Sequence, residues 1–234
     1  MRLSLPMIDS DRDGMIIHPC ADSEAVAQFA ATAVLEAAKV AIVSRGVFHW
    51  ALAGGTTPKR CYELLRDADM DWSKVHVWFG DERCLPVGDA ERNDLMADQA
   101  LLNHVPIPAS QIHRMAAELG PEIAADQYSA LLAEAPCMDL ILLGIGEDGH
   151  TASLFPGNPG LDDRRLAIPV YNSPKAPSKR VSMGYSVFNA AHRCLIMVAG
   201  KGKTEVMARI RSGERLPVAR VEGSEWLIDK DAFD

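Results

Sequence analysis

The chain has 234 residues, of which 48% are hydrophobic and 24% are charged, and its formal net charge is -8. This length allows one large domain or two small ones, with enough apolar residues to bury a core. The acidic balance argues against a general affinity for nucleic acid or an anionic membrane, although a few cations in one cleft could still bind a small anion.

The cysteines and the N-terminal residues indicate a cytoplasmic protein. The five cysteines are scattered and never spaced as CxxC, so neither a disulfide framework nor a zinc site is expected. The N-terminal segment MRLSLPMIDSDRDGM lacks the uninterrupted apolar stretch of a signal peptide. No apolar stretch is expected to approach the roughly 20 residues that cross a bilayer. We expect no nucleic-acid or membrane partner, and a monomer or weak homodimer.

Strand-like runs alternate with helix-like segments along the chain. Residues 22–46 predict a long helix, because apolar residues recur at i, i+3 and i+4 spacing and a Gly ends the segment. Residues 57–67 predict a helix with Thr57 as N-cap and Pro58 at its first position. Residues 137–146 are apolar on both faces, as in a central parallel strand. Further strands are expected over 15–19, 47–53, 74–80, 111–115, 165–171, 180–185 and 193–200, and further helices over 91–105, 121–135 and 203–213.

This alternation indicates an α/β fold, with a mostly parallel sheet covered by helices, in a single domain over residues 1–234. Three turns rich in glycine or acidic residues follow strands, at 53–57, 80–85 and 144–151. Ligands gather at the carboxyl ends of strands in open parallel sheets. We therefore expect the three turns to converge on one pocket.

The first turn, in ALAGGTTPKR (51–60), has the features of a phosphate site. Gly54 and Gly55 allow a ligand to approach the backbone, and the free N–H groups at a helix start favour an anion. Thr56 and Thr57 add hydroxyl donors. The P-loop and dinucleotide-binding glycine patterns are absent. An ordinary strand-to-helix turn is the alternative interpretation.

The second turn, in WFGDERCLP (78–86), places charged side chains at a strand end. Arg83 can form a forked contact with a phosphate or carboxylate. The carboxylate of Asp81 can hold a sugar hydroxyl or orient a histidine. The alternative is a solvated charged turn.

The third turn, in GIGEDGHTASLFPG (144–157), surrounds His150 with glycines. Imidazole titrates near neutral pH and is the usual general base, and either Asp148 or Asp81 could fix its tautomer. A surface histidine in a flexible loop is the alternative, but the glycines around it indicate a constrained backbone. The other six histidines are interpreted as structural.

Two later segments supply cations that could neutralise an anion. Arg180 ends the Pro-rich loop 172–180, and Lys203 stands where a helix is expected to begin. A cation is unfavourable near a helix N-terminus, and a bound anion would offset that effect. Lys175, Lys179 and Lys201 are equally well explained as solvated side chains.

The order and spacing of these segments resemble those of the 6-phosphogluconolactonases, hydrolases of the oxidative pentose phosphate pathway within the glucosamine/galactosamine-6-phosphate isomerase superfamily. The most specific matching piece is GEDGHTASLFPG. The chain departs from the family at Ala53, where Ser is frequent, and in VSMGY after Arg180, where the family often has TLT. The other matching pieces are GGTTPKRCYELL, WFGDERCLP, ERND, SPKAPSKRVS, GKGKTEV and LPVARVEGSEWLID.

The resemblance implies a Rossmann-like fold with a few extra C-terminal strands and no metal or organic cofactor. It also implies 6-phospho-D-glucono-1,5-lactone as the substrate and His150 as the general base. The residues that it places around the phosphate or the lactone end are Gly54, Gly55, Thr56, Arg83, Arg180 and Lys203.

Two other functions stay open at this point. One is a sugar-phosphate isomerase or deaminase. In glucosamine-6-phosphate deaminase the histidine loop continues with IAFNEP, whereas here TASLFP follows and no acidic residue comes before Asp162, which favours hydrolysis. The other is a non-catalytic sugar-phosphate sensor. Such regulators add a DNA-binding helix-turn-helix, for which we find no spare segment.

Overall fold

The computed structural model describes residues 9–10 and 15–233, and within them a seven-stranded sheet has the order β1-β2-β10-β9-β6-β3-β4. Six of these strands run parallel, which confirms the mostly parallel sheet expected from the sequence. The parallel strands are β2 (Ile16–Cys20), β3 (Phe48–Leu52), β4 (Val75–Phe79), β6 (Leu140–Gly144), β9 (Cys194–Val198) and β10 (Glu225–Asp229), and β1 (Asp9–Ser10) pairs antiparallel to β2.

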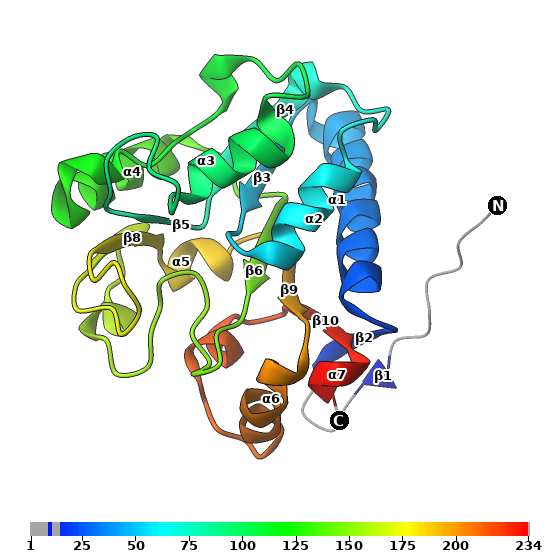
Figure 1. The fold of residues 1–234 in the computed structure, drawn as a ribbon. Coiled ribbons are helices and arrows are strands. Elements are labelled where there is room, and N and C mark those ends of the chain that lie inside the picture. Colours follow the sequence, from blue (N-terminus) through cyan, green and yellow to red (C-terminus); the bar gives the residue numbers. More distant parts are fainter. Residues whose placement is uncertain (1–8, 11–14, 234) are drawn as a thin grey trace.

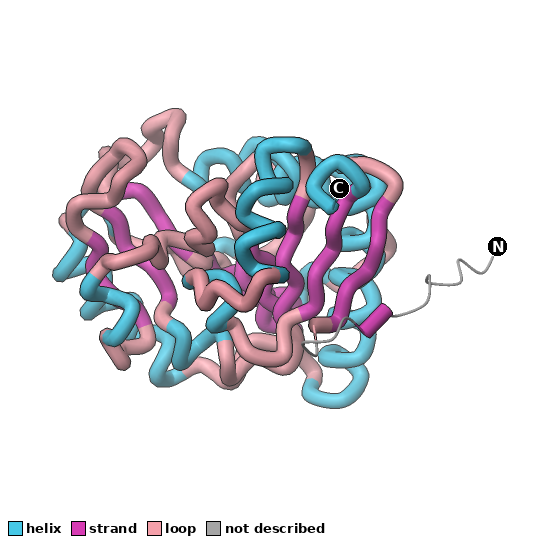
Figure 2. Tube along the Cα trace, turned by 90° about the horizontal axis from the view of Figure 1, so that it is seen from below, coloured by secondary structure: helices cyan, strands magenta, loops and turns pink. Residues whose placement is uncertain are grey.

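A second, antiparallel sheet of three strands lies beside the larger one (Figure 2). It consists of β5 (Asp81–Arg83), β8 (Arg180–Met183) and β7 (Ala167–Val170), in the order β5-β8-β7. Residues 81–83 are therefore not the simple turn that the sequence suggested. Their pairing places Arg83 directly opposite Arg180.

Helices cover both faces of the larger sheet, and successive strand residues face two different cores. Trp50 and Leu142 lie in the core that α1 and α2 cover, whereas Ala51 and Leu143 lie in the core that α4 and α6 cover. This alternation explains why β3 and β6 are apolar throughout. The helices are α1 (Ser23–Arg45), α2 (Thr56–Leu64), α3 (Asn93–Ala97), α4 (Pro121–Glu134), α5 (Tyr185–Phe188), α6 (Thr204–Arg211) and α7 (Lys230–Phe233).

The helix α1 begins and ends as its sequence predicts. The Asp22 side chain accepts a hydrogen bond from the Ala25 N–H at 2.9 Å, and Gly46 closes the helix at a φ of 79°. With 23 residues and a mean hydropathy of 1.6 over an 18-residue window, α1 is long and apolar enough to cross a membrane by length and composition. The expectation that no stretch has this length was wrong. Eight of its residues are buried, and it packs against α2 and the sheet (Figure 1).

Three local predictions were also wrong. Residues 111–115 form no strand, because Ile112 makes only an isolated bridge to Val77 after a 3₁₀ turn. Thr57 is not the N-cap of α2, since the helix begins one residue earlier, after Gly55, and no side chain caps it. The helix expected over 91–105 is shorter and continues from α3 as a π-helix over Asp98–Leu102. The expectation about a signal peptide concerns residues that lie mostly outside the described part of the chain.

Candidate active site

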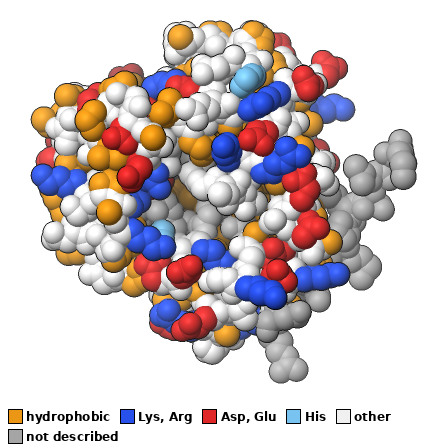
Figure 3. Space-filling model, viewed as in Figure 1, with side chains coloured by type: hydrophobic (Ala, Val, Ile, Leu, Met, Phe, Trp, Pro, Cys, Tyr) orange, Lys and Arg blue, Asp and Glu red, His pale blue; other side chains and the backbone are white. Residues whose placement is uncertain are grey.

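A cavity of about 160 Å³ lies where the three predicted turns meet. Residues 53–55 after β3, residues 80–83 after β4 and residues 144–152 after β6 all contribute to its lining, so the expected convergence is present. In the space-filling view a histidine and several Lys or Arg side chains gather around a hollow in this face (Figure 3). The described residues that complete the lining are Asn93, Leu143 and Arg180.

The side chains of His150 and Asp148 form a hydrogen-bonded pair at this cavity. His150 Nδ1 lies 2.5 Å from Asp148 Oδ1, and the backbone N–H of His150 donates to the same oxygen at 3.2 Å. Because Nδ1 serves Asp148, the geometry assigns the proton to Nδ1 and leaves the lone pair on Nε2. The Asp148 carboxylate, rather than Asp81, is therefore the group that fixes the imidazole tautomer.

The pKa values of the pair fit these roles. Burial lowers the pKa of His150, while the hydrogen bond and charge of Asp148 oppose that effect. Burial would raise the pKa of Asp148, but its hydrogen bond and ion pair with His150 outweigh burial and lower it. The ring is therefore neutral at neutral pH and able to accept a proton.

The loop that carries the pair is fixed by its glycines. A Cβ at Gly146 would lie 2.0 Å from His150 Nδ1 and 2.7 Å from Asp148 Oδ1, so the pair occupies the space above this residue. Gly149 has a φ of 85°, and a Cβ there would collide with Leu216. The predicted backbone reason for these glycines is therefore present.

Asp81 lines the cavity, but its carboxylate hydrogen-bonds to Ser153 and Asn93 rather than to the imidazole. Its Oδ2 accepts the hydroxyl of Ser153 at 2.6 Å, and its Oδ1 accepts an Nδ2–H of Asn93 at 3.1 Å. Asp81 is 6% exposed and Ser153 is fully buried. Asp81 therefore ties the loop after β6 to the start of α3.

Arg83 and Arg180 bring positive charge to the same cavity. The Nη1 of Arg83 donates to the Glu91 carbonyl, whereas its buried Nε has no acceptor among the described residues. Arg180 donates from Nε and Nη2 to carbonyls of the loop 175–177, and burial lowers its pKa without removing its charge. A ligand with negatively charged oxygens would supply the acceptors that these guanidinium groups lack.

Gly54 and Gly55 border the cavity for different physical reasons. Gly55 has a φ of 110°, which disfavours any other residue at this position. It is the N-cap residue of α2, whose first N–H groups are open to a ligand. Gly54 has no such backbone constraint, but a Cβ there would lie 2.1 Å from Asn93 Oδ1.

Four predicted residues lie outside this lining. One of them is Asp148, which bonds to His150 as described above. Thr56 and Thr57 border a neighbouring hollow of about 420 Å³, between the start of α2 and residues 199–200. Lys203 stands at the start of α6, as predicted, near Glu147 and Lys175. Burial lowers the pKa of Lys203, and the nearby charge of Glu147 opposes this. Their roles in binding stay predictions.

Among the described residues, no group of three or more His, Cys, Asp or Glu side chains could hold a metal ion. The absence of a cofactor stays a prediction from the resemblance.

Comparison with known proteins places the chain in a family. A family model described as glucosamine-6-phosphate isomerases/6-phosphogluconolactonase matches residues 21–228. The chain belongs to this family. It is 37% identical to 6-phosphogluconolactonase of Streptomyces coelicolor, over 95% of this chain and 94% of that relative. It is 35% identical to 6-phosphogluconolactonase of Mycobacterium tuberculosis, over 90% and 94% of the two chains. A solved structure of 6-phosphogluconolactonase from Thermotoga maritima matches with a TM-score of 0.85 and 25% identity, over 92% of this chain and 100% of that one.

The structure also brings to the cavity residues that sequence reasoning passed over. Asn93, Ala152 and Ser153 all lie at or beside the cavity, and none was predicted as a site residue. Asn93 belongs to the ERND piece, which was noted only as a family match. A strained backbone is the signal at Ala152, whose φ is 48°, but that signal exists only in the structure.

Proposed function

We propose that this chain hydrolyses 6-phospho-D-glucono-1,5-lactone to 6-phospho-D-gluconate in the oxidative pentose phosphate pathway, with His150 as general base. The observation that carries this proposal is the His150–Asp148 pair at a cavity that two arginines also line. Relatives named 6-phosphogluconolactonase match nearly the whole chain, which supports the same substrate.

The reaction begins when Nε2 of His150 takes a proton from a water molecule. The water oxygen bonds to C1 of the lactone, and the carbonyl electrons move onto the carbonyl oxygen. The oxyanion then re-forms the carbonyl as the bond between C1 and the ring oxygen breaks, and the imidazolium gives its proton to the ring oxygen, which becomes a hydroxyl group. The carboxylic acid that results loses a proton to the solvent and becomes the carboxylate of the product. Asp148 holds the ring in the required tautomer throughout. General-base catalysis of this kind supplies about 10²–10⁴-fold in rate.

The two arginines and the glycine pair supply binding and charge stabilisation. Arg83 and Arg180 stabilise negative charge on the phosphate or on the tetrahedral oxyanion. The backbone at Gly54 and Gly55, at the open N-terminus of α2, offers N–H groups to the other anionic end. These contacts hold C1 near the imidazole and so contribute mainly through orientation.

We further propose that the chain acts as a single domain in the cytoplasm, as a monomer or weak homodimer. It needs no metal or organic cofactor and binds neither nucleic acid nor membranes. The net charge of -8 supports the last point, because it opposes binding to anionic polymers and lipid surfaces.

The test is the rate of acid release from the lactone, compared with the unaided opening of the ring. We expect His150→Ala to lower kcat about 10²–10⁴-fold. Arg83→Gln should mainly raise KM, since it removes a binding contact. The base assignment is wrong if His150→Ala keeps the turnover of the unsubstituted protein at saturation.

The same assay separates the two alternative functions. A sugar-phosphate isomerase or deaminase would turn over glucosamine 6-phosphate and leave the lactone at its unaided rate. A non-catalytic sensor would bind 6-phosphogluconate without accelerating either reaction. The TASLFP segment favours hydrolysis, because it holds no acidic residue that could serve as a second proton-transfer group.

A further inference from the structure

A buried charge cluster fixes the start of α3 next to the active site. The carboxylate of Glu82, in β5, accepts hydrogen bonds from the backbone N–H groups of Asn93 at 2.7 Å and Asp94 at 2.8 Å. Arg92 grips the Asp94 carboxylate with two hydrogen bonds of 2.9 and 2.8 Å. Glu82 and Arg92 are 1% and 2% exposed. Burial raises the pKa of Glu82 to about 7, and its backbone hydrogen bonds oppose that rise. The backbone of Asn93 is therefore held between two buried side chains whose hydrogen bonds are satisfied.

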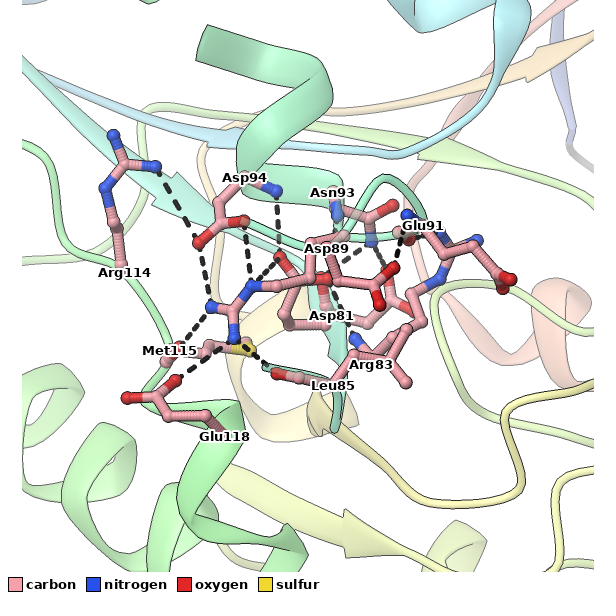
Figure 4. Close-up of polar contacts among 12 residues, drawn as sticks. Asp81, Arg83, Leu85, Asp89, Glu91, Asn93, Asp94, Arg114, Met115 and Glu118 are labelled. Carbon is pink, nitrogen blue, oxygen red and sulfur yellow. Dashed lines mark hydrogen bonds and ion pairs between the residues drawn. The ribbon is translucent and has the colours of Figure 1, made fainter. Parts of the chain in front are cut away.

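Further contacts keep this cluster rigid. Arg92 also donates to the carbonyls of Leu85 and Met115 and to the Glu118 carboxylate, at 3.0 to 3.2 Å. Figure 4 shows Asn93 and Asp94 at the start of α3, with Met115 and Glu118 on the opposite side of the network. A guanidinium with this many acceptors has no freedom to move with a ligand.

The side chain of Asn93 uses this fixed position to bridge two walls of the cavity. Its Nδ2 donates to the carbonyl oxygen of Asp81 at 2.9 Å and to the Asp81 carboxylate at 3.1 Å. Because both partners are acceptors, the amide nitrogen faces Asp81 and the amide oxygen faces Gly54. Oδ1 stands so close to Gly54 that only a glycine fits there.

We propose that Asn93 is a positioning residue of the active site: its amide sets the gap between the glycine turn at Gly54 and the Asp81 carboxylate. Asp81 in turn accepts the Ser153 hydroxyl, so the same amide fixes the loop that carries His150. This inference rests on the proposed function. It predicts that Asn93 acts through Gly54 and Asp81, and that its loss is felt first in ligand binding.

The test is a double-mutant cycle between residues 54 and 93. Gly54→Ala introduces no backbone strain, because the φ of Gly54 lies outside the left-handed region, but its Cβ collides with the Asn93 amide. We expect Gly54→Ala to lower kcat/KM about 10²-fold, since small displacements at an active site have effects of this size. Asn93→Ala should raise KM and weaken 6-phosphogluconate binding about 10-fold, with a smaller change in kcat.

The double variant decides the matter. Since Asn93→Ala removes the atoms that collide with the Cβ introduced by Gly54→Ala, kcat/KM of the double variant Gly54→Ala/Asn93→Ala should stay within about threefold of Asn93→Ala alone. Losses that multiply, or an Asn93→Ala variant with unchanged KM and product affinity, would overturn the inference. If Asn93→Ala does not fold, Asn93→Ser replaces it in both variants, because serine also removes the amide from Gly54.

A matched control removes another bonded amide away from the cavity. The Asn158 side chain donates to the Tyr171 carbonyl at 3.1 Å and accepts from the Gly160 N–H at 2.9 Å. Asn158→Ala should leave KM and product binding unchanged, and an equal loss there would overturn the inference. If the unsubstituted protein neither opens the lactone nor binds 6-phosphogluconate, the proposed function falls and this inference with it. Activity of the unsubstituted protein combined with multiplied losses overturns only the role of Asn93.

Discussion

The imidazole of His150 lies against the ring of Phe155, with ring centroids 4.4 Å apart and the planes inclined by 37°. Phe155 is 1% exposed and comes from the same loop. It shields one face of the imidazole from water, while Asp148 bonds to the edge. Phe155 contributes to the burial that lowers the pKa of His150, whereas Asp148 raises that pKa. Substitutions at the two positions should therefore act in opposite directions.

Replacing Phe155 by Leu should move the acid limb of the kcat/KM profile to higher pH. The smaller side chain admits water to the imidazole face, so the pKa of His150 rises toward its ordinary value. We expect an upward shift of this limb and a modest loss of kcat. The profile is measured with the lactone at several pH values, and thermal unfolding checks the fold. An unchanged or downward shift would show that Phe155 does not shield the base.

Replacing Asp148 by Asn should move the same limb to lower pH. The neutral amide no longer stabilises the imidazolium, so the pKa of His150 falls further below its ordinary value. Because Asn can also hold the wrong tautomer, kcat should drop about 10²–10⁴-fold. The measurement is again the pH dependence of kcat/KM. A variant with unchanged kcat would remove Asp148 from the mechanism.

Acid should destabilise the fold through a row of stacked rings at the opposite end of β3 and β4. His49, His76 and His113 stack in sequence, and Trp78 lies 3.9 Å from His113 between ring centroids. Burial lowers the pKa of both His49 and His113 to about 4, from an ordinary value of 6.5. The unfolded chain therefore binds protons more readily than the folded one. Stability should be full above pH 6.5 and fall between pH 6.5 and about pH 4.

The loss should amount to about 1–2 kcal/mol for each ring, allowing for partial solvent screening. Urea unfolding at a series of pH values measures it. His113→Phe keeps the stacking on Trp78 and removes one titrating group, so it should remove about half of the loss. An identical pH dependence in that variant would contradict this account.

Replacing Arg92 by Met should destabilise the chain by about 3 kcal/mol, because Asp94 would lose its two-hydrogen-bond partner and keep only the looser contact with Arg114 at 3.8 Å. Chemical denaturation measures the free energy of unfolding. The matched control is Arg60→Met, which breaks an exposed pair with Glu24 and should change stability little. Similar changes in the free energy of unfolding of the two variants would mean that the buried ion pairs of Arg92 contribute no more to stability than an exposed pair.

Much of the fold could be predicted from local patterns. The apolar run at 137–146 and the capped, Ala-rich segment at 22–46 correspond to β6 and α1, because burial and capping act within a few residues. Residues 111–115 look equally strand-like, but their pairing with β4 is limited to the isolated bridge between Ile112 and Val77. Pairing partners for β5 lie about a hundred residues away, and a local pattern contains no information about them.

The candidate site was predictable to the extent that it follows from topology. The rule that ligands gather at strand ends led to the turns at Gly54, Asp81 and His150, which line the same cavity. The choice between Asp148 and Asp81 as partner of the imidazole required the three-dimensional structure. Asp148 is close to His150 in sequence, and Asp81 was expected to be close to it in space, so the sequence favoured neither. Asn93 was missed because an asparagine after charged residues has no local feature that separates it from a surface turn.

The cross-strand pairing of Arg83 with Arg180 has a practical consequence. The charge of Arg83 disfavours that of Arg180, while the carboxylate of Asp81 favours it, so a small dianion that contacts both guanidinium groups would add to the stabilisation that Asp81 supplies. Sulfate or phosphate in the medium would bind between Arg83 and Arg180 and compete with the substrate. Kinetic work on this protein is therefore best done in zwitterionic buffers. Added inorganic sulfate should raise the melting temperature of the protein and lower the rate of lactone hydrolysis.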